Sequence, residues 1–264
     1  MSVTVVTASV TVVTAYYRMK SKFCHEQYLR WMRNFLENSG CKLVIYTDKS
    51  NVSLMETMRK DHRDNTRIVV KEFQDLRMYK KMDIWERHLS TLDPERSIHS
   101  KELYVIWNEK SEFMKDAIER DYFQSEYYIW MDIGAFRCRE NRGDLTLEQI
   151  KYWPNEERVK DTFGSRVGFA LIRPYFMSVS LDTNGMTTKD LKFGEHVGGL
   201  FGGHKTILLE WHRLFYEMLD RYIDHGRFAG KDQNMMANIA LVRPDLVKLL
   251  TNSCKDPYFC LHHI

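Results

Sequence analysis

The stretch Tyr127-Tyr-Ile-Trp-Met-Asp-Ile-Gly134 decides the fold class. Its first five residues are apolar or aromatic, which is typical of a buried β-strand, and Asp132 and Gly134 follow where that strand would end. In α/β sheets, ligands bind beyond the carboxyl ends of the strands. Asp132 could instead cap a helix or pair with a cation in a loop, but its aromatic neighbours make an unpaired carboxylate costly. We therefore interpret Asp132 as a site residue.

The chain before this stretch alternates between strand and helix patterns. Residues 10–16, 43–47 and 67–70 are rich in β-branched residues and predict strands. Residues 28–36 carry apolar side chains at helical spacing, with Gly40 as the expected carboxyl-terminal cap, and residues 54–63 are partly helical. A βαβαβ order favours a parallel sheet flanked by helices, which is an α/β fold.

The remaining segments continue the alternation. Residues 78–92 predict a helix, and Ser111 is expected to cap a second one. The glycine-rich residues 196–203 predict a tight turn that opens a long helix. Further elements are expected at residues 167–172 (strand), 232–240 (helix) and 246–250 (strand).

Composition restricts the class of protein. The 264 residues carry 39 Lys+Arg and 36 Asp+Glu, a net charge of +3, which argues against a nucleic-acid-binding role. Hydrophobic residues make up 44% and charged residues 28%, as in a folded globular chain, and the length suits one domain. Five widely spaced cysteines without a C-x-x-C pair indicate reduced thiols and a cytoplasmic location.

The N-terminal segment repeats itself, because residues 2–8 are copied identically as residues 9–15. The uncharged segment up to Tyr17 approaches the length of a membrane span, but it lacks the basic and leucine-like regions of a signal peptide. Its Val/Thr composition favours a strand, and the second copy is expected to form it. We expect no transmembrane segment.

Several common catalytic motifs are absent from the sequence. The segment from Gly198 to Thr206 resembles a phosphate-binding loop, but His204 separates the last glycine from Lys205, so the Walker spacing fails. Ligand contact by this segment and a purely structural turn remain equal alternatives. No G-x-S-x-G elbow, catalytic cysteine signature or H-E-x-x-H pair occurs, and covalent hydrolysis is unsupported.

Four segments in order give the chain a family resemblance. They are Val12-Val-Thr-Ala-Tyr-Tyr-Arg18, Tyr104-Val-Ile-Trp-Asn-Glu-Lys-Ser111, Ile129-Trp-Met-Asp-Ile-Gly134 and Gly198-Gly-Leu-Phe-Gly-Gly203. Together they resemble the HtrL/YibB-like proteins of bacterial surface-polysaccharide loci and large algal viruses. The resemblance implies a GT-A-like single domain with a Rossmann-like mixed sheet. It implies a nucleotide-sugar-binding half over residues 9–134 and an acceptor-binding half over residues 135–264.

The resemblance also implies an activity: a glycosyltransferase that moves a sugar from a nucleotide donor, foremost a UDP-sugar, to a glycan acceptor. For a viral member the location would be the host cytoplasm. Such enzymes usually hold Mn²⁺ or Mg²⁺ with an Asp-x-Asp, of which Asp132-Ile-Gly134 keeps only the first acid. Either His262 or His263 completes the metal shell, or the protein works without a metal.

Charge then suggests roles for individual residues. A departing diphosphate needs a nearby cation, and Lys110 is the expected supplier beside an Asp132-bound metal. Inversion needs a carboxylate to take the acceptor proton, for which Asp232 is expected and Asp190 is the reserve. Asp232 could equally be a helix cap. The other expected donor-binding residues are Thr14, Tyr16, Tyr17, Asp48, Asn108, Gly134 and Gly199.

Two rival functions stay open at this point. An inactive nucleotide- or glycan-binding protein of the same fold would have lost its activity with the second acid. A methyltransferase would normally carry a glycine-rich turn after its first strand, and residues 14–17 lack one.

Overall fold

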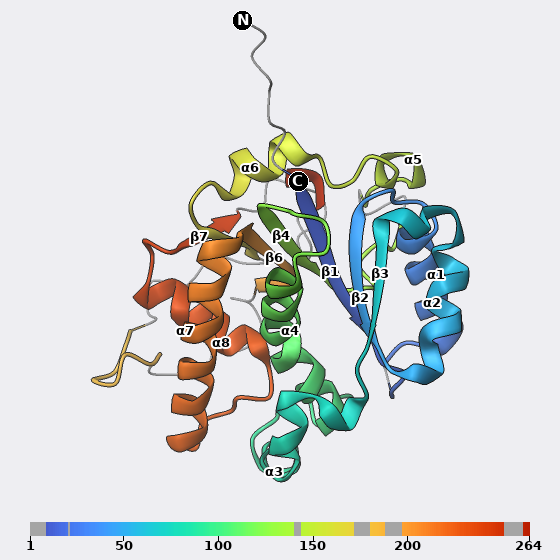
Figure 1. Cartoon of the computed structure of the whole chain (residues 1–264). Coiled ribbons are helices and arrows are strands. Elements are labelled where there is room, and N and C mark those ends of the chain that lie inside the picture. Colours follow the sequence, from blue (N-terminus) through green and yellow to red (C-terminus); the bar gives the residue numbers. More distant parts are fainter. Residues whose placement is uncertain (1–8, 21, 140–143, 172–179, 188–196, 251–260) are drawn as a thin grey trace, which may run out of the picture.

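One mixed seven-stranded sheet organises the chain (Figure 1). The computed structural model describes residues 9–20, 22–139, 144–171, 180–187, 197–250 and 261–264. The strand order is β3-β2-β1-β4-β6-β5-β7. The strands are β1 (Val10–Tyr16), β2 (Lys42–Thr47), β3 (Thr66–Val70), β4 (Tyr127–Met131), β5 (Val167–Leu171), β6 (Val197–His204) and β7 (Val247–Leu250).

Strand direction sets the position of the site. Strands β3, β2, β1 and β4 run parallel, so their carboxyl ends share one edge of the sheet. Strand β6 is antiparallel to both β4 and β5, and β5 pairs in parallel with β7. The predicted α/β class, with a mixed sheet flanked by helices, is confirmed. Because β4 from the first half pairs with β6 from the second, both halves belong to one sheet.

The helices cover both faces of the sheet (Figure 1). The α-helices are α1 (His25–Leu36), α2 (Val52–Met58), α3 (Met82–Thr91), α4 (Lys101–Arg120), α5 (Leu147–Ile150), α6 (Glu156–Phe163), α7 (Lys205–Asp224) and α8 (Asp232–Val242). Short 3₁₀ helices are η1 (Lys49–Asn51), η2 (Lys60–Asn65), η3 (Phe73–Asp75), η4 (Arg77–Lys81) and η6 (Leu261–His263).

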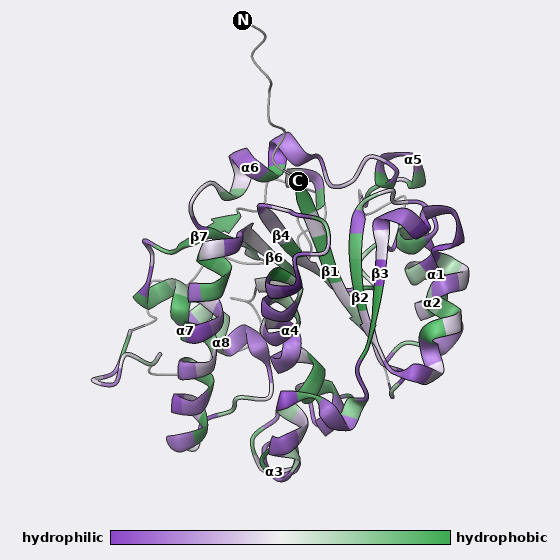
Figure 2. Cartoon of the chain, in the orientation of Figure 1, coloured by the Kyte–Doolittle hydropathy of each residue, from purple (hydrophilic) through white to green (hydrophobic). Residues whose placement is uncertain are grey.

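Alternation along β1 divides the core into two layers. Val13 and Ala15 belong to a cluster with the buried faces of α4, α7 and α8. Val12 and Tyr16 belong to a second cluster with α1, α2 and α6. Successive strand residues point to opposite faces, so a strand buried on both sides is mostly apolar, and the buried hydroxyls of Thr11 and Thr14 in β1 are hydrogen-bonded. The hydrophobic strands at the centre of Figure 2 show this, while the helices carry many hydrophilic residues.

The helix boundaries correct two predictions. Helix α4 begins after Ser100, whose side chain accepts from Leu103 N, and it runs without a break past Ser111, which is buried in its middle. The prediction that Ser111 caps a helix was therefore wrong, because residues 104–107 already belong to the same helix. Helix α1 ends at Leu36 with Glu37 as its cap, so Gly40 does not terminate it.

The glycine-rich segment is the largest correction, because it forms strand β6 and not a turn. A Cβ at Gly202 would lie 2.8 Å from the Tyr128 carbonyl oxygen and 3.0 Å from the Phe163 ring. A Cβ at Gly203 would lie 3.0 Å from the Arg166 carbonyl oxygen. Glycine is needed here for the close approach of side chains and backbone, not for a turn.

Helix α3 supports the segment that leads into α8. His88 of α3 is buried, and its Nδ1 accepts a hydrogen bond from the Ala229 N–H at 3.3 Å. Burial, aided by the charge of Arg87, lowers the pKa of His88 to about 4. His88 is therefore neutral in the native protein at neutral pH.

Within the described residues, no helix is long and apolar enough to cross a membrane.

The first prediction tests the close packing at β6. Gly202→Ala should lower the free energy of unfolding by roughly 1–3 kcal/mol, because the added methyl overpacks the contact with Tyr128 and Phe163. Gly40→Ala is the matched control, since nothing lies within 4 Å of a Cβ there. Urea unfolding measures both. Equal stability of the two variants would contradict the packing explanation.

A second prediction concerns pH. The unfolded chain protonates His88 near pH 6.5, but the native protein resists protonation until about pH 4. Stability from this group is therefore complete above pH 6.5 and is lost as the pH falls, by about 2 kcal/mol at pH 5. In His88→Asn, whose Oδ1 can accept from Ala229, this loss between pH 7 and 5 should disappear. Unfolding curves of both proteins at the two pH values measure it, and parallel losses would contradict it.

Candidate functional site

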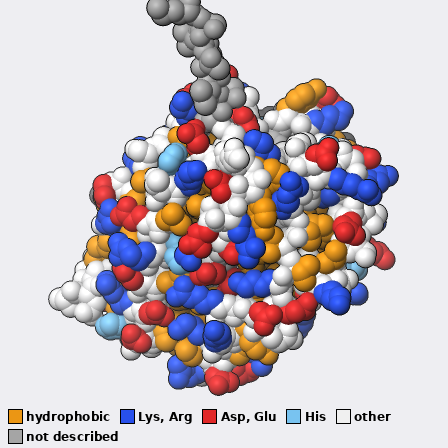
Figure 3. Space-filling model, viewed as in Figure 1, with side chains coloured by type: hydrophobic (Ala, Val, Ile, Leu, Met, Phe, Trp, Pro, Cys, Tyr) orange, Lys and Arg blue, Asp and Glu red, His pale blue; other side chains and the backbone are white. Residues whose placement is uncertain are grey.

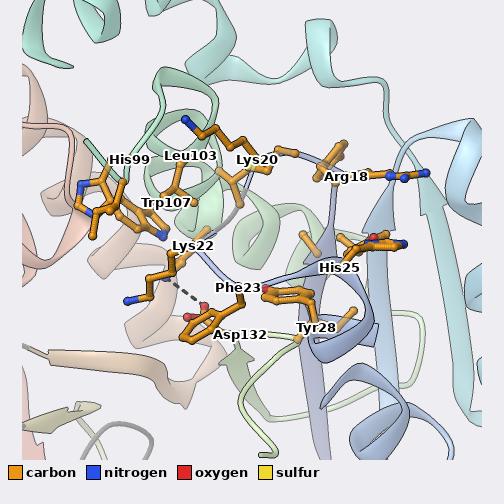
Figure 4. A pocket seen from close by; sticks show the side chains of 18 of the residues that line it. Arg18, Lys20, Lys22, Phe23, His25, Tyr28, His99, Leu103, Trp107 and Asp132 are labelled. Carbon is orange, nitrogen blue, oxygen red and sulfur yellow. Dashed lines mark ion pairs between the residues drawn. The ribbon is translucent and has the colours of Figure 1, made fainter. Parts of the chain in front are cut away.

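A cavity of about 520 Å³ opens at the carboxyl ends of β1 and β4. Its walls come from the end of β1, the segment that leads into α1, the beginning of α4, and the end of β4. Figure 4 shows Asp132 on one side, Arg18 and His25 on another, and His99, Leu103 and Trp107 opposite them. This is the edge of the sheet where the sequence pattern predicted a ligand.

The floor of the cavity contains an ion-paired lysine. Lys110 Nζ of α4 lies 3.1 Å from Asp132 Oδ1, an ion pair drawn as a dashed line in Figure 4, and 3.0 Å from Asp232 Oδ2 at the start of α8. The side chains of Lys110 and Asp232 are 8% and 7% exposed, whereas that of Asp132 is 35% exposed. One ammonium therefore joins two carboxylates, and only Asp132 is widely open to the cavity.

Backbone and aromatic contacts fix Asp132. Its N–H donates to the Gly199 carbonyl of β6 at 3.0 Å, which extends the strand pairing by one residue. Trp130 Nε1 donates to Asp132 Oδ1 at 2.8 Å. The carboxylate is thus held at the end of a buried strand while part of it faces the cavity.

A second set of contacts holds Asp232. Asn108 is fully buried, and its Nδ2 donates to the carbonyls of Ala229 and Gly230, each at 3.1 Å. Asp232 Oδ1 accepts from the Gln233 N–H at 2.9 Å, so Lys110 and this N–H use both of its oxygens. Asn108 therefore positions the backbone that delivers Asp232.

The electrostatics favour a charged lysine. Burial alone would lower the pKa of Lys110, but Asp132 and Asp232 outweigh it, and the pKa rises well above its usual value. Burial and the nearby charge of Asp132 raise the pKa of Tyr28, which also lines the cavity, so its hydroxyl stays protonated. Two carboxylates and one ammonium leave this floor with a net negative charge.

Basic side chains at the mouth offset that charge. Arg18, Lys20 and Lys22 line the cavity from the segment after β1, and all three are exposed. On the face drawn in Figure 3, acidic and basic side chains are interspersed. Trp107 and Leu103 of α4 add an apolar and aromatic part to the lining, and Figure 4 draws Lys20 and Lys22 on the same side as these two residues. The cavity thus offers both cationic and aromatic groups.

Four of the predicted donor-binding residues line this cavity together: Tyr16, Tyr17, Lys110 and Asp132. Burial raises the pKa of Tyr16, with Arg18 opposing the shift and Asp48 adding to it, so Asp48 lies within electrostatic reach of this tyrosine. Asp48 itself caps η1, where its Oδ1 accepts from Asn51 N at 3.2 Å.

The other predicted donor residues lie behind the cavity wall. Thr14 Oγ1 donates to the Met131 carbonyl at 2.7 Å and links β1 to β4. Asn108 and Gly199 hold Asp232 and Asp132 through the contacts described above. A Cβ at Gly134 would lie 3.2 Å from the Tyr28 ring, so this glycine makes room for Tyr28.

The structure separates His262 from Asp132. The His262 carbonyl accepts from Arg158 Nη1 of α6 at 3.2 Å, and Glu156 of α6 accepts from the N–H of Val10, the first residue of β1. His262 therefore lies at the amino edge of the sheet, and the seven residues of β1 separate the two edges by roughly 20 Å. The side chain of His263 and all of Asp190 lie outside the described residues.

A divalent metal does not fit the described residues at this cavity. Among the residues that the structure describes, no group of three His, Cys, Asp or Glu side chains could hold a metal ion. The ammonium of Lys110 lies between Asp132 and Asp232, where a metal bridging these carboxylates would have to lie.

Sequence reasoning missed the basic mouth and the aromatic wall. Arg18, Lys20 and Lys22 directly follow the first strand, and the rule that ligands bind beyond strand ends could have found them. His99, which belongs to no motif in the sequence, also lines the cavity, and its Nδ1 lies 2.7 Å from Asp93 Oδ2. No pattern in the sequence indicates that Trp107 faces this cavity.

Comparisons with known proteins give limited structural likeness. No curated protein matches the chain. The crystal structure of 4-diphosphocytidyl-2C-methyl-D-erythritol synthase from Anaerococcus prevotii is 10% identical, with a TM-score of 0.42, and the match covers 94% of this chain and 89% of that one. The apo form of mouse xyloside xylosyltransferase 1 is also 10% identical, with a TM-score of 0.46, and the match covers 92% of this chain and 84% of that one.

The family comparison is more extensive. Residues 1–262 match the HtrL_YibB family, which is described as bacterial protein of unknown function. The fold agrees with the expected α/β class, with a parallel βαβ half continued by a mixed half. Since the match spans nearly the whole sequence, this chain belongs to the HtrL_YibB family.

Proposed function

We propose that this protein is a glycosyltransferase that moves a sugar from a nucleoside-diphosphate donor, a UDP-sugar, to a hydroxyl of a glycan acceptor, with inversion. The observation that carries the proposal is the Lys110–Asp132 pair on the floor of a cavity at the carboxyl ends of parallel strands. Nucleotides bind at such edges, and sugar transfer needs both a cation and a carboxylate at the reacting centre.

The cationic groups of the lining suit a diphosphate. Arg18, Lys20 and Lys22 come from one short segment and line the same cavity, where they can neutralise phosphate oxygens. Lys110 at the floor is already neutralised by its two carboxylates, so the mouth cations supply most of the positive charge that the diphosphate needs. As the bond from the sugar to the diphosphate breaks, negative charge grows on the leaving oxygen, and these cations stabilise it.

The nucleoside is assigned to the end of β1. Tyr16 lines the cavity there, and Asp48 lies within its electrostatic reach. An aromatic ring beside a carboxylate can pack against a base and accept a hydrogen bond from a base or ribose. This assignment leaves the aromatic wall with Trp107 for the acceptor sugar, whose ring can lie flat against the indole.

The contacts favour Asp132 as the carboxylate that meets the acceptor. In the reaction, the acceptor oxygen attacks the anomeric carbon, the bond to the diphosphate breaks, and a base takes the hydroxyl proton. Asp132 is 35% exposed and lines the cavity, whereas Asp232 is 7% exposed and both its oxygens are engaged. The base role of Asp232 stays a prediction, and its contacts suit a residue that positions Lys110.

The third prediction tests donor binding. UDP should bind with a Kd that Lys20→Ala/Lys22→Ala raises roughly tenfold, because two cations leave the diphosphate side. Lys160→Ala is the control, since this exposed lysine of α6 lies at the amino edge of the sheet. Titration calorimetry with UDP and GDP measures the affinities. Equal UDP affinities of wild type, the double variant and Lys160→Ala would contradict donor binding at Lys20 and Lys22.

Turnover separates an enzyme from an inactive binding protein. Purified protein is incubated with UDP-glucose, UDP-galactose, GDP-mannose or TDP-glucose and mixed glycan acceptors, and released nucleoside diphosphate is measured. Acceptor-dependent release supports the glycosyltransferase. UDP binding without release from any donor would favour the inactive nucleotide-binding protein of the same fold.

The fourth prediction compares the two carboxylates. Asp132→Asn should lower turnover by roughly 10²–10⁴-fold with UDP affinity within a few-fold of wild type, because an amide cannot take the acceptor proton. Asp232→Asn should cost less than Asp132→Asn, because its main effect is a weaker hold on Lys110. Circular dichroism melting of both variants controls for folding. A larger turnover loss in Asp232→Asn at unchanged melting temperature would return the base role to Asp232.

A further inference from the structure

We propose that the ammonium of Lys110 is the resident cation of this site, that it replaces a divalent metal between Asp132 and Asp232, and that donor binding is therefore independent of divalent metal. The inference deepens the proposed function, and it rests on that function only where it concerns the donor. The position of the cation between its carboxylates is a property of the chain alone.

The distances define the position. Lys110 Nζ lies 3.1 Å from Asp132 Oδ1 and 3.0 Å from Asp232 Oδ2, which are hydrogen-bonding distances for an ammonium. A magnesium ion would need oxygens at about 2.0–2.1 Å and several further ligands. No metal can bridge these two oxygens while the ammonium stays between them.

Burial makes the ammonium hard to displace. Lys110 is buried in α4, and its Nζ lies 5.8 Å from the centroid of the Trp130 ring. Moving it away would leave a charged group without its partners in a region of low water content, which costs several kcal/mol. An entering ion would also repel the ammonium it displaces. A tethered cation needs no association step, whereas a free ion loses translational freedom on binding.

The side chain of Tyr28 crowds the position of the second acid of an Asp-x-Asp. At Gly134, where that acid would stand, an added Cβ would lie 3.2 Å from both Cε2 and Cζ of Tyr28. A side chain at this position would therefore require the Tyr28 ring to shift by a few tenths of an ångström. The second carboxylate comes instead from α8, and it reaches the cation from the other side through Asp232.

Charge also accounts for the basic mouth. One ammonium carries half the charge of a divalent ion, and two carboxylates already neutralise it. The remaining charge of a diphosphate must then be met by other cations. Arg18, Lys20 and Lys22 line the cavity and are the side chains that can meet it.

The test uses manganese chloride alone, followed by electron paramagnetic resonance. Wild-type protein should bind Mn²⁺ no tighter than about 1 mM, the weak end of oxygen-ligand sites. Lys110→Ala should bind Mn²⁺ at least tenfold tighter, because it leaves two facing carboxylates without a cation. Adding Asp232→Asn to Lys110→Ala should abolish the gain, and Lys110→Arg should resemble wild type. Circular dichroism confirms that each variant is folded.

Tight Mn²⁺ binding by wild-type protein, or no gain in a folded Lys110→Ala, would overturn the inference. If Lys110→Ala does not fold, the wild-type titration and Lys110→Arg still decide, because tight binding by either one contradicts a resident ammonium. Weak binding by both supports it.

A second experiment tests donor binding. The affinity of wild-type protein for UDP is measured in EDTA and in saturating Mn²⁺. The two values should agree within threefold. A tenfold gain with Mn²⁺ would overturn metal independence. Absence of UDP binding under both conditions would reject the proposed function instead, while the Mn²⁺ titration, which contains no nucleotide, would still decide the role of Lys110.

Discussion

The ion pairs of Lys110 are the interaction on which the site depends. They join α4, the end of β4 and the start of α8, three elements that are far apart in the sequence. A buried charge is tolerated only when it is paired, so removal of Lys110 would leave two carboxylates without their cation, whereas removal of either aspartate would leave a single ion pair. The two halves of the chain are thus joined by electrostatics at the same place where the cavity opens.

Helix α4 carries this arrangement in three consecutive buried residues. Asn108 holds the carbonyls of residues 229 and 230, and Lys110 holds the two aspartates. Between them, Glu109 accepts from the N–H groups of Arg77 and Met78 at 3.0 and 2.8 Å. Successive helix residues point in different directions, so one turn of α4 fixes three separate segments. The geometry of the floor is therefore set by the core rather than by a loop.

The sequence predicted the parallel half of the sheet well. Strands β1, β2 and β4 are continuous runs of β-branched or aromatic residues, which are typical of strands buried on both faces. It also placed Asp132 and Lys110 in one site. It failed at β6, where glycines that permit close packing have the same composition as a turn, and at Ser111, because capping residues also occur inside helices. The meeting of Asp232 with Lys110 depends on the packing of α8 against α4, which no local pattern records.

Most charged side chains at the floor of the cavity are enclosed, whereas those at its mouth are exposed. Lys110 and Asp232 are almost fully enclosed and hold each other in one geometry, whereas Arg18, Lys20 and Lys22 are long, exposed side chains whose attraction is weakened by salt. Electrostatic attraction at an exposed mouth mainly accelerates the encounter with an anionic ligand. A preorganised floor contributes instead where charge develops during reaction, because its dipoles and charges need no rearrangement. In the function that we propose, the exposed cationic mouth therefore captures the donor, and the enclosed, ion-paired floor acts on the reacting bond.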